Sequence, residues 1–266
     1  MQGVGNDVAI RCFFLEKDRA AHACLEEFAN AQVARGDDVR AVNKALEDAI
    51  PDIQDFVSSG SGRSFTFLFI DPKGWSGLDL SVIRPLIELP DCEVLINFMT
   101  SFIQRFVASP NEQTADSFQR FFGRPGVREE AIAIVDAQDR EDYLFQAYAT
   151  QLGVAGNYQY TSAAIVLRPT KERTHFHLVY ATRHPKGIEV FKRAERHAME
   201  RMPEIRAEAK ERFLVAQTGQ LSLFRPTELI RAGRLDELKA HYASLAREAA
   251  EKRLRAQSPV CYDDLF

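Results

Sequence analysis

The spacing of apolar positions changes several times along the chain and predicts strands that alternate with helices. Short apolar runs at 8–15, 39–42 and 93–98 are typical of strands, whereas the segments 20–34 and 45–57 between them have helical character. Strands that alternate with helices indicate βαβ units, in which the strands form a parallel sheet. The first hundred residues therefore predict an α/β fold.

The stretch 64–78 has the clearest pattern of a strand followed by a functional loop. Its apolar run ends on Asp71, which is followed by Pro72 and then by two glycines. A nearly unbroken apolar run is typical of a strand that is covered on both faces, and the residues after it are typical of a functional loop. Because open α/β sheets bind ligands beyond the carboxyl ends of their strands, Asp71 is the first candidate site residue.

The pattern changes after residue 110. Residues 110–151 are predicted to be helical, with these aromatic side chains as core anchors: Phe118, Phe121, Phe122, Tyr143, Phe145 and Tyr148. Two apolar runs, 158–167 and 174–182, predict a β-hairpin. Two long helices follow: one runs from 188 to 216 with a break at Pro203, and one runs over 228–255 with an apolar stripe of leucines. A shorter helix at 80–87 is expected to be interrupted by Pro85.

Composition narrows the class of protein. The chain has 266 residues, 45% hydrophobic and 27% charged, which is typical of a globular protein with one large domain and an appendage. The net charge of −4 gives no general reason to expect nucleic acid or an anionic membrane as a partner. Basic residues at 247–255 are interleaved with Glu248 and Glu251, which favours a solvated helix face over a nucleic-acid site.

The cysteines and the first residues bear on the cellular compartment. Four cysteines lie far apart with no C-x-x-C pair, so neither a zinc site nor a disulfide framework is predicted, and a reducing cytoplasm is expected. The first residues lack the pattern of a signal peptide. No apolar run is long enough to span a bilayer.

Several features together resemble a class I S-adenosylmethionine-dependent methyltransferase: the βαβ units, an acid after the first strand, the Asp-Pro turn and the terminal hairpin. Three ordered blocks, 69–78, 93–98 and 177–187, more closely resemble the three-Cys-motif partner protein family, a likeness that covers roughly residues 10–216. The resemblance implies a Rossmann-like, mostly parallel methyltransferase sheet with a C-terminal antiparallel hairpin, a helical insertion and a helical C-terminal extension.

The same resemblance implies a division of the chain and a partner. Residues 1–109 would form the first part of the core, 110–156 the helical insertion, 157–216 the hairpin and helix that complete the core, and 217–266 the extension. The family is regarded as methyltransferase-like, so S-adenosylmethionine is the implied cofactor. It is named for a neighbouring radical-SAM-type protein, which carries the three cysteines and is the implied partner.

The chain departs from the family pattern at its beginning. The family opens with a strand and a Gly-rich loop similar to D-x-F-A-G-x-G, and nothing here matches it. In a dinucleotide-type fold the acidic residue lies about 20 residues after that loop, and Glu16 has only 15 residues before it. We therefore expect an N-terminus that begins after the loop. The absent strand would lie between the strand that ends at Glu16 and the strand that ends at Asp71. Without it, we expect these two strands to pair directly, to leave a gap or to receive a strand from elsewhere.

The resemblance assigns cofactor-binding roles to residues at two strand ends. Glu16, with Lys17 beside it, would accept hydrogen bonds from the two hydroxyls of a ribose, and Asn43 would contact the adenine. The alternatives are ordinary ones. Glu16 can be a solvated loop acid next to the helix cap Asp18, and Asn43 can serve only in a turn.

Asp71 and Pro72 would be the catalytic pair. In methyltransferases that modify amines, such a carboxylate and the prolyl carbonyl accept hydrogen bonds from the target nitrogen, and an aromatic side chain, here Trp75, lines the pocket. Such chemistry needs positioning more than a strong base. The alternative is that Asp71 caps a helix and Trp75 is part of the core.

Three residues are candidates for the substrate side of the crevice: Lys73, Asn97 and His184. Lys73 replaces a ring that is usual in the family, and as an isolated lysine it can also be a solvated rim residue. Asn97 can instead brace a loop, and His184 can be a turn residue. His175 and His177 share a strand face, but no third ligand accompanies them, so no metal site is predicted.

Two functions follow from these observations. The first is an S-adenosylmethionine-dependent methyltransferase-like protein whose acceptor is unknown, with an amine nitrogen as the implied class. The second is a non-catalytic interaction module that keeps the fold and works through the three-cysteine partner. The absent Gly-rich loop motivates the second function, because that loop provides the close backbone approach to the cofactor.

Overall fold

The computed structural model describes residues 9–60, 62, 64–72, 79–107, 112–219 and 233–256. These residues form an α/β fold with one mixed sheet and one parallel pair of strands. They divide into two compact units. Unit 1 comprises the described residues up to Ala164 together with His177–Phe191, and unit 2 comprises Ile165–Phe176 and the described residues from Lys192 onward.

The first βαβ unit forms the two-stranded sheet of unit 1. Strand β1 (Arg11–Leu15) leads through helix α1 (Arg19–Val33) to strand β2 (Asp38–Val42), and the two strands pair in parallel from Arg11 opposite Asp38 to Leu15 opposite Val42. Helix α1 begins after Asp18, whose carboxylate accepts a hydrogen bond from the Ala21 amide. The predicted strands and helix of this segment are confirmed.

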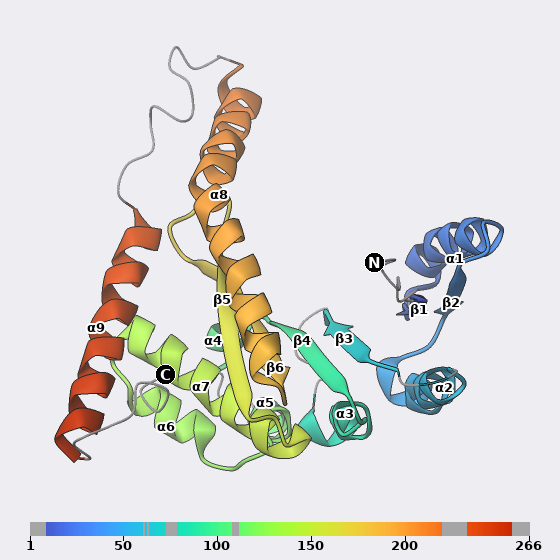
Figure 1. The fold of residues 1–266 in the computed structure, drawn as a ribbon. Coiled ribbons are helices and arrows are strands. Elements are labelled where there is room, and N and C mark those ends of the chain that lie inside the picture. Colours follow the sequence, from blue (N-terminus) through green and yellow to red (C-terminus); the bar gives the residue numbers. More distant parts are fainter. Residues whose placement is uncertain are drawn as a thin grey trace, which may run out of the picture. The chain divides into compact units, whose positions relative to one another are not determined.

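The second sheet has the strand order β3-β4-β6-β5. Helix α2 (Leu46–Ser58) leads to β3 (Thr66–Ile70), which pairs in parallel with β4 (Cys92–Phe98) after the crossover through α3 (Leu80–Ile87). The hairpin strands β5 (Tyr160–Leu167) and β6 (Thr174–Thr182) follow later in the chain, and β6 runs antiparallel to β4 (Figure 1). The predicted mixture of parallel strands and a late antiparallel hairpin is confirmed.

Four helices connect β4 to the hairpin: α4 (Thr100–Val107), α5 (Glu112–Phe122), α6 (Val127–Ala133) and α7 (Ala137–Gly156). Their aromatic side chains share one core with β4 and β6. Four of the predicted anchors are fully buried, namely Phe118, Phe121, Phe122 and Tyr148. The rings of Phe121 and Tyr148 stack with their centroids 4.8 Å apart. Tyr143 and Phe145 are partly buried against the same cluster.

Unit 2 contains most of α8 (Pro185–Thr218) and all of α9 (Arg234–Ala256). Its core is small: Leu167, Leu235 and Leu238 pack with partly buried methionines of α8. The leucine stripe predicted for the last helix is only partly buried, because Leu245 and Leu254 are 44% and 42% exposed. Residues 228–232 of that predicted helix, and 220–224 of the preceding interruption, lie outside the described residues.

Two helix breaks that the sequence predicts are wrong. Pro85 lies inside α3 and Pro203 lies inside α8, and both helices continue past the proline. A proline removes one backbone hydrogen bond and bends a helix, but it does not end a helix whose flanking turns are held by other contacts. Here α3 is held by the buried side chains of Ile83, Leu86 and Ile87.

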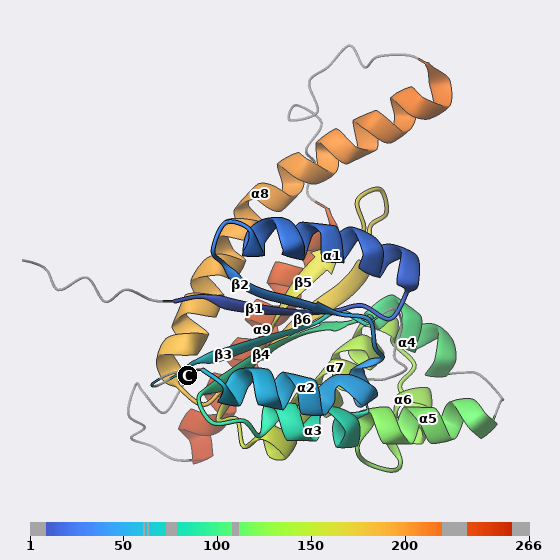
Figure 2. The same ribbon diagram turned by 90° about the vertical axis from the view of Figure 1, so that its right-hand side faces the viewer.

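The strands β1 and β3 do not pair with each other. Each lies at the edge of its own sheet in the described residues, so the direct pairing that was one expected outcome is not seen there. The two strands nevertheless share a helical layer, because Phe13, Leu15 and Leu68 pack against one cluster built by α2 and α3. Figure 2 shows β1 and β3 running in the same direction.

The prediction that β3 is covered on both faces is wrong. Its burial alternates, and Phe67 and Phe69 are 53% and 57% exposed. The physical reason is that, within the described residues, β3 packs on α2 and α3 only through the face that carries Leu68, so the side chains of the other face are exposed. Within the described residues, no helix combines the length and apolar character needed to cross a membrane.

Candidate functional site

The carboxyl ends of β3 and β4 bring two of the predicted residues together. Because the strands are parallel neighbours with Ile70 opposite Ile96, the residues that follow lie at the same edge of the sheet. The side-chain amide of Asn97 donates a hydrogen bond from Nδ2 to Oδ1 of Asp71 over 2.7 Å. Asn97 therefore fixes one oxygen of the Asp71 carboxylate and leaves the other for further hydrogen bonds.

Asn97 itself is buried and, among the described residues, keeps one side-chain acceptor unpaired. Its side chain belongs to a residue only 8% exposed, and within the described part of the chain its Oδ1 atom has no hydrogen-bond partner. A buried acceptor without a partner costs free energy, so native proteins rarely keep one without a bound molecule or a functional reason. The pair of Asp71 and Asn97 thus has an acceptor available for a ligand.

A second pair forms at the carboxyl ends of β1 and β2. The Nδ2 atom of Asn43 donates to the backbone oxygen of Glu16 over 2.8 Å, and the Glu16 amide donates to the Val42 carbonyl. The Glu16 side chain uses Oε1 to accept the amide of Asp18 at 2.8 Å. This contact places the Glu16 carboxylate beside the helix cap Asp18, as its alternative role expects, while a carboxylate with two oxygens can still accept a hydroxyl.

The remaining predicted residues of this edge are described only in part. Lys17 is exposed next to Glu16, and Pro72 directly follows Asp71. Lys73 and Trp75 lie outside the described residues. Their predicted roles at the substrate side and in the pocket wall therefore stay predictions.

His184 does not join this edge, contrary to its predicted place in the crevice. Strand β6 runs antiparallel to β4 with Leu178 opposite Asn97 and Ala181 opposite Val94, so His184 lies beyond the other end of β4. There the His184 amide donates to Oγ1 of Thr182, and Nδ1 accepts the Lys186 amide at the start of α8. The histidine has the turn role that was its alternative.

A buried polar cluster lies directly beside the site and was missed by the sequence. His177 is 1% exposed on β6 opposite Phe98, and its Nδ1 atom lies 2.6 Å from Oγ1 of Thr100. Its ring stacks on Phe145 at 5.2 Å, and Nε2 lies 3.8 Å from Oε1 of Glu141. Burial lowers the pKa of His177 to about 4, so the imidazole is neutral at pH 7.

The cluster of Thr100, Glu141 and His177 could be found only through its tertiary contacts. Its members come from α4, α7 and β6, and no local spacing in the sequence links them. Gln104 completes the cluster by donating to Glu141 Oε2 over 3.0 Å. Within the ranges that the structure describes, no group of three or more potential ligands could hold a metal ion.

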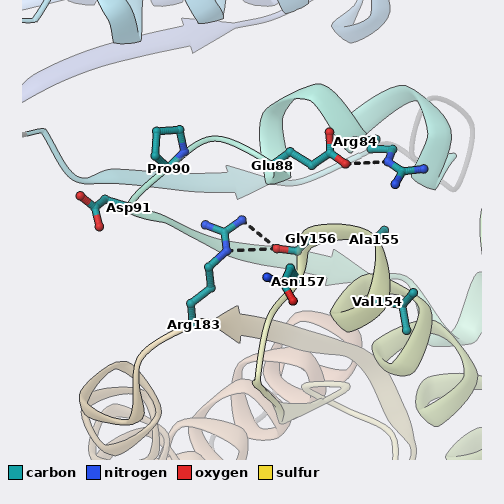
Figure 3. Close-up of a pocket in the computed structure, with 9 residues that line it drawn as sticks. All are labelled: Arg84, Glu88, Pro90, Asp91, Val154, Ala155, Gly156, Asn157 and Arg183. Carbon is teal, nitrogen blue, oxygen red and sulfur yellow. Dashed lines mark hydrogen bonds and ion pairs between the residues drawn. The ribbon is translucent and has the colours of Figure 1, made fainter.

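A cavity of about 420 Å³ lies at the opposite end of β4 from Asn97. Figure 3 shows its lining, with Asp91 just before β4, Arg183 just after β6, and Gly156 and Asn157 at the end of α7. The charged groups of this lining are engaged within the chain. Arg84 of α3 donates a hydrogen bond to Glu88, the residue directly after the helix, over 2.8 Å, so its charge is paired within the chain.

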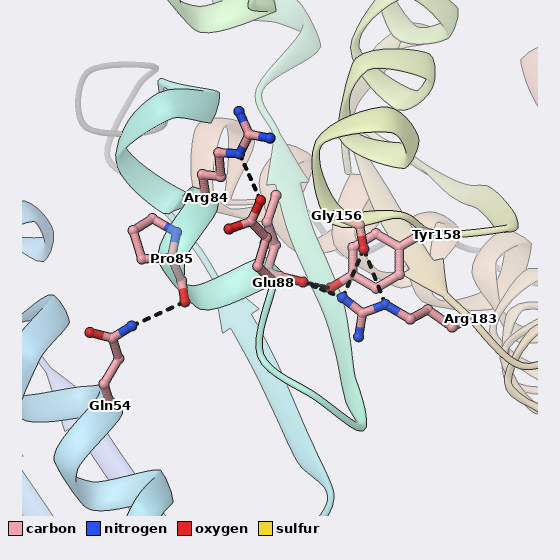
Figure 4. A network of polar contacts seen from close by, with 8 residues as sticks. Gln54, Arg84, Pro85, Glu88, Gly156, Tyr158 and Arg183 are labelled. Atoms are coloured by element: carbon pink, nitrogen blue, oxygen red, sulfur yellow. Dashed lines mark hydrogen bonds and ion pairs between the residues drawn. The ribbon is translucent and has the colours of Figure 1, made fainter.

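Arg183 is committed to backbone carbonyls. Its guanidinium donates to the carbonyl oxygens of Ile87, Leu89 and Gly156 at 2.6, 2.9 and 2.7 Å, and it lies 4.6 Å above the ring of Tyr158. Figure 4 shows Arg183 beside Tyr158, with its contacts to Gly156 at the end of α7 and to the end of α3. The arrangement holds two helix ends together, so we interpret this cavity as a structural junction. The catalytic candidates lie at the other end of the strands.

No known protein family, curated protein or solved structure matches the chain.

Proposed function

We propose that the chain is an S-adenosylmethionine-dependent methyltransferase-like protein with its site at the carboxyl ends of β1, β2, β3 and β4. The observation that carries the proposal is the hydrogen-bonded pair of Asp71 and Asn97 at the ends of two adjacent parallel strands. The pair of Glu16 and Asn43 at the ends of β1 and β2 supports it. Four residues chosen as strand-end candidates thus form two contacting pairs.

The residues at this edge fit the proposed cofactor and acceptor. Glu16 retains a carboxylate oxygen for a ribose hydroxyl, and the orphaned Oδ1 of Asn97 can accept a hydrogen bond from a bound molecule. S-adenosylmethionine supplies an activated methyl group when bound. Asp71, oriented by Asn97, would accept a hydrogen bond from an amine nitrogen together with the Pro72 carbonyl and so hold its lone pair toward that methyl group.

Isothermal titration of the full chain with S-adenosylmethionine or S-adenosylhomocysteine tests this proposal. We expect saturable binding that Glu16→Gln weakens about 10- to 100-fold, because a hydrogen bond to a charged group contributes about 1.5–3 kcal/mol. The matched control is Glu26→Gln, at an exposed position of α1, which should bind as the unmodified chain does. No saturable binding of either compound would overturn the proposal.

A second candidate function is a non-catalytic interaction module that works with a radical-SAM-type three-cysteine protein. The exposed rings of Phe67 and Phe69 on β3 favour it, because large apolar side chains exposed at a sheet edge are typical of contact surfaces. Co-purification of the two proteins should then be unaffected by Asp71→Ala. A complex that needs Asp71 would instead favour the catalytic function.

A further inference from the structure

The end of β4 that carries Asn97 extends beyond the ladder of this strand with β3. The parallel ladder with β3 ends at Ile96, whereas the antiparallel ladder with β6 continues to Phe98, which lies opposite His177. Beyond Ile96 the hydrogen bond from Asn97 to Asp71 continues the connection to β3 through side chains. The position of Asn97 therefore depends on how β6 and the start of α4 hold this end of the strand.

One hydroxyl group joins β6, the end of β4 and the start of α4. Oγ1 of Thr100, the first residue of α4, lies 2.6 Å from Nδ1 of His177 and 3.2 Å from the carbonyl oxygen of Phe98. In the neutral ring Nδ1 either accepts the hydroxyl hydrogen or donates its own, so both tautomers form a hydrogen bond to Thr100. Because Phe98 directly follows Asn97, this contact holds the strand one residue from the candidate site.

The ring of His177 is itself held from several sides. It is 1% exposed, stacks on Phe145 with the ring centroids 5.2 Å apart, and meets Phe98 edge to face at 6.4 Å. Its Nε2 atom lies 3.8 Å from Oε1 of Glu141. Burying a polar ring costs free energy that an apolar ring avoids, unless the polar ring makes its hydrogen bonds. A histidine here therefore contributes a directed hydrogen bond to Thr100 in addition to packing.

We propose that His177 is a positioning residue of the candidate site. Through Thr100 it fixes the end of β4, and with it the direction in which Asn97 donates to Asp71. It acts through the backbone because side chains alternate along a strand: Phe98 and the histidine opposite it face the aromatic core, and Asn97 faces the other side. The importance of this residue for methyl transfer rests on the proposed function. Its effect on the hydrogen bond between Asn97 and Asp71 is measured without a ligand.

Hydrogen exchange of the Asn97 side-chain amide, followed by nuclear magnetic resonance on the full ¹⁵N-labelled chain, tests this inference. The rate is taken relative to that of the Val94 backbone amide in the middle of β4, because global unfolding alters both rates alike. Thr100→Val keeps the size of the side chain and removes the hydroxyl, so we expect this ratio to rise about tenfold. Thr100→Ser keeps the hydroxyl and should give the ratio of the unmodified chain.

A matched variant separates positioning from a loss of stability. Ile103→Val removes one methylene group from a buried residue of the same helix, which weakens packing and leaves the Thr100 hydroxyl in place. We expect it to lower the melting temperature without changing the exchange ratio of Asn97. A rise of the ratio in Ile103→Val equal to that in Thr100→Val would overturn the inference, and so would an unchanged ratio in Thr100→Val.

Two variants of the histidine decide the question if Thr100→Val does not fold. His177→Asn keeps an amide at the place of Nδ1, which faces Thr100, whereas His177→Gln moves the amide toward the place of Nε2, which faces Glu141. We expect the exchange ratio of Asn97 to rise about tenfold in His177→Gln and to rise less in His177→Asn. Equal ratios in the two variants would overturn the inference.

Titration of the same samples with S-adenosylhomocysteine separates this inference from the proposed function. A chain that shows the expected exchange ratios but binds none of the compound would overturn the proposed function and would support the positioning of Asn97 by His177. A chain that binds the compound, with the same ratio in all variants, would overturn only the inference.

Discussion

At the scale of single residues, His177 shows how burial changes chemistry beside the candidate site. Its imidazole lies between Thr100 and Phe145 with 1% exposure, and burial lowers its pKa to about 4 from the ordinary 6.5. The unfolded chain therefore binds a proton at this histidine between pH 6.5 and 4, whereas the folded chain does not. The free energy of unfolding is fully retained above pH 6.5 and falls as the pH drops toward 4.

This linkage gives a measurable pH dependence. Denaturant unfolding should show a loss of roughly 3 kcal/mol attributable to His177 between pH 7 and pH 4, since each pKa unit corresponds to about 1.36 kcal/mol. In His177→Gln that part of the dependence should disappear. His197→Gln, at an exposed helix position, keeps His177 and is the matched control. An unchanged pH profile in His177→Gln would contradict the assignment.

The backbone at Gly187 lies so close to the side chains of Glu93 and Tyr180 that a side chain there would clash with them. A Cβ atom there would lie 2.5 Å from Oε1 of Glu93 and 2.7 Å from the hydroxyl of Tyr180, which itself donates to Glu93. We expect Gly187→Ala to destabilise the fold by about 1–2 kcal/mol, because the overpacking exceeds the gain in helix propensity.

Gly153 provides the matched comparison for this prediction. It is also a helical glycine, but its Cβ would meet its nearest neighbour at 3.5 Å, an ordinary contact. Gly153→Ala should therefore leave the melting temperature unchanged or raise it by the helix-propensity gain of up to about 1 kcal/mol. Equal effects of the two substitutions in thermal unfolding would contradict the role of Gly187.

The sequence predicted part of the candidate site for a definite physical reason. Parallel strands deliver the residues at their carboxyl ends to one edge of the sheet, so Asp71 with Asn97, and Glu16 with Asn43, could be found from strand ends alone. His184 could not be placed this way, because the antiparallel direction of β6 carries it to the other end.

At the scale of elements, Arg183 joins the ends of two helices. Its fork of donors reaches carbonyls at the end of α3 and at Gly156 of α7, a geometry that a lysine cannot reproduce. Arg183→Lys should lower the free energy of unfolding by about 2–3 kcal/mol, because buried carbonyls lose their donors. Arg84→Lys changes an exposed ion pair and should cost less than about 1 kcal/mol. Similar values for both variants in denaturant unfolding would contradict this role.

The elements themselves were largely predictable, with errors that have physical causes. The apolar period located the strands and helices of the βαβ units, since amphipathic helices and buried strands differ in period. The break expected at Pro85 was wrong because buried side chains hold the turns of α3, and α8 also continues past Pro203. The exposure of Phe67 and Phe69 could not be predicted, because an apolar strand has the same sequence pattern whether one of its faces is packed or both are.

At the scale of the whole molecule, the proposed function depends on one end of the parallel strands. The carboxyl ends hold Glu16, Asn43, Asp71 and Asn97, and the opposite end of β4 holds a cavity whose lining includes Asn157 and the committed Arg183. The two ends carry different asparagines, so one labelling experiment can distinguish them.

That experiment is nuclear magnetic resonance of the full chain with ¹⁵N-labelled asparagine, titrated with S-adenosylhomocysteine. Each side-chain amide gives a separate signal, and signals move when a ligand binds beside them. We predict that the signals of Asn43 and Asn97 shift together and saturably while that of Asn157 stays in place. A shift of Asn157 alone, or no shift of any asparagine, would contradict the account.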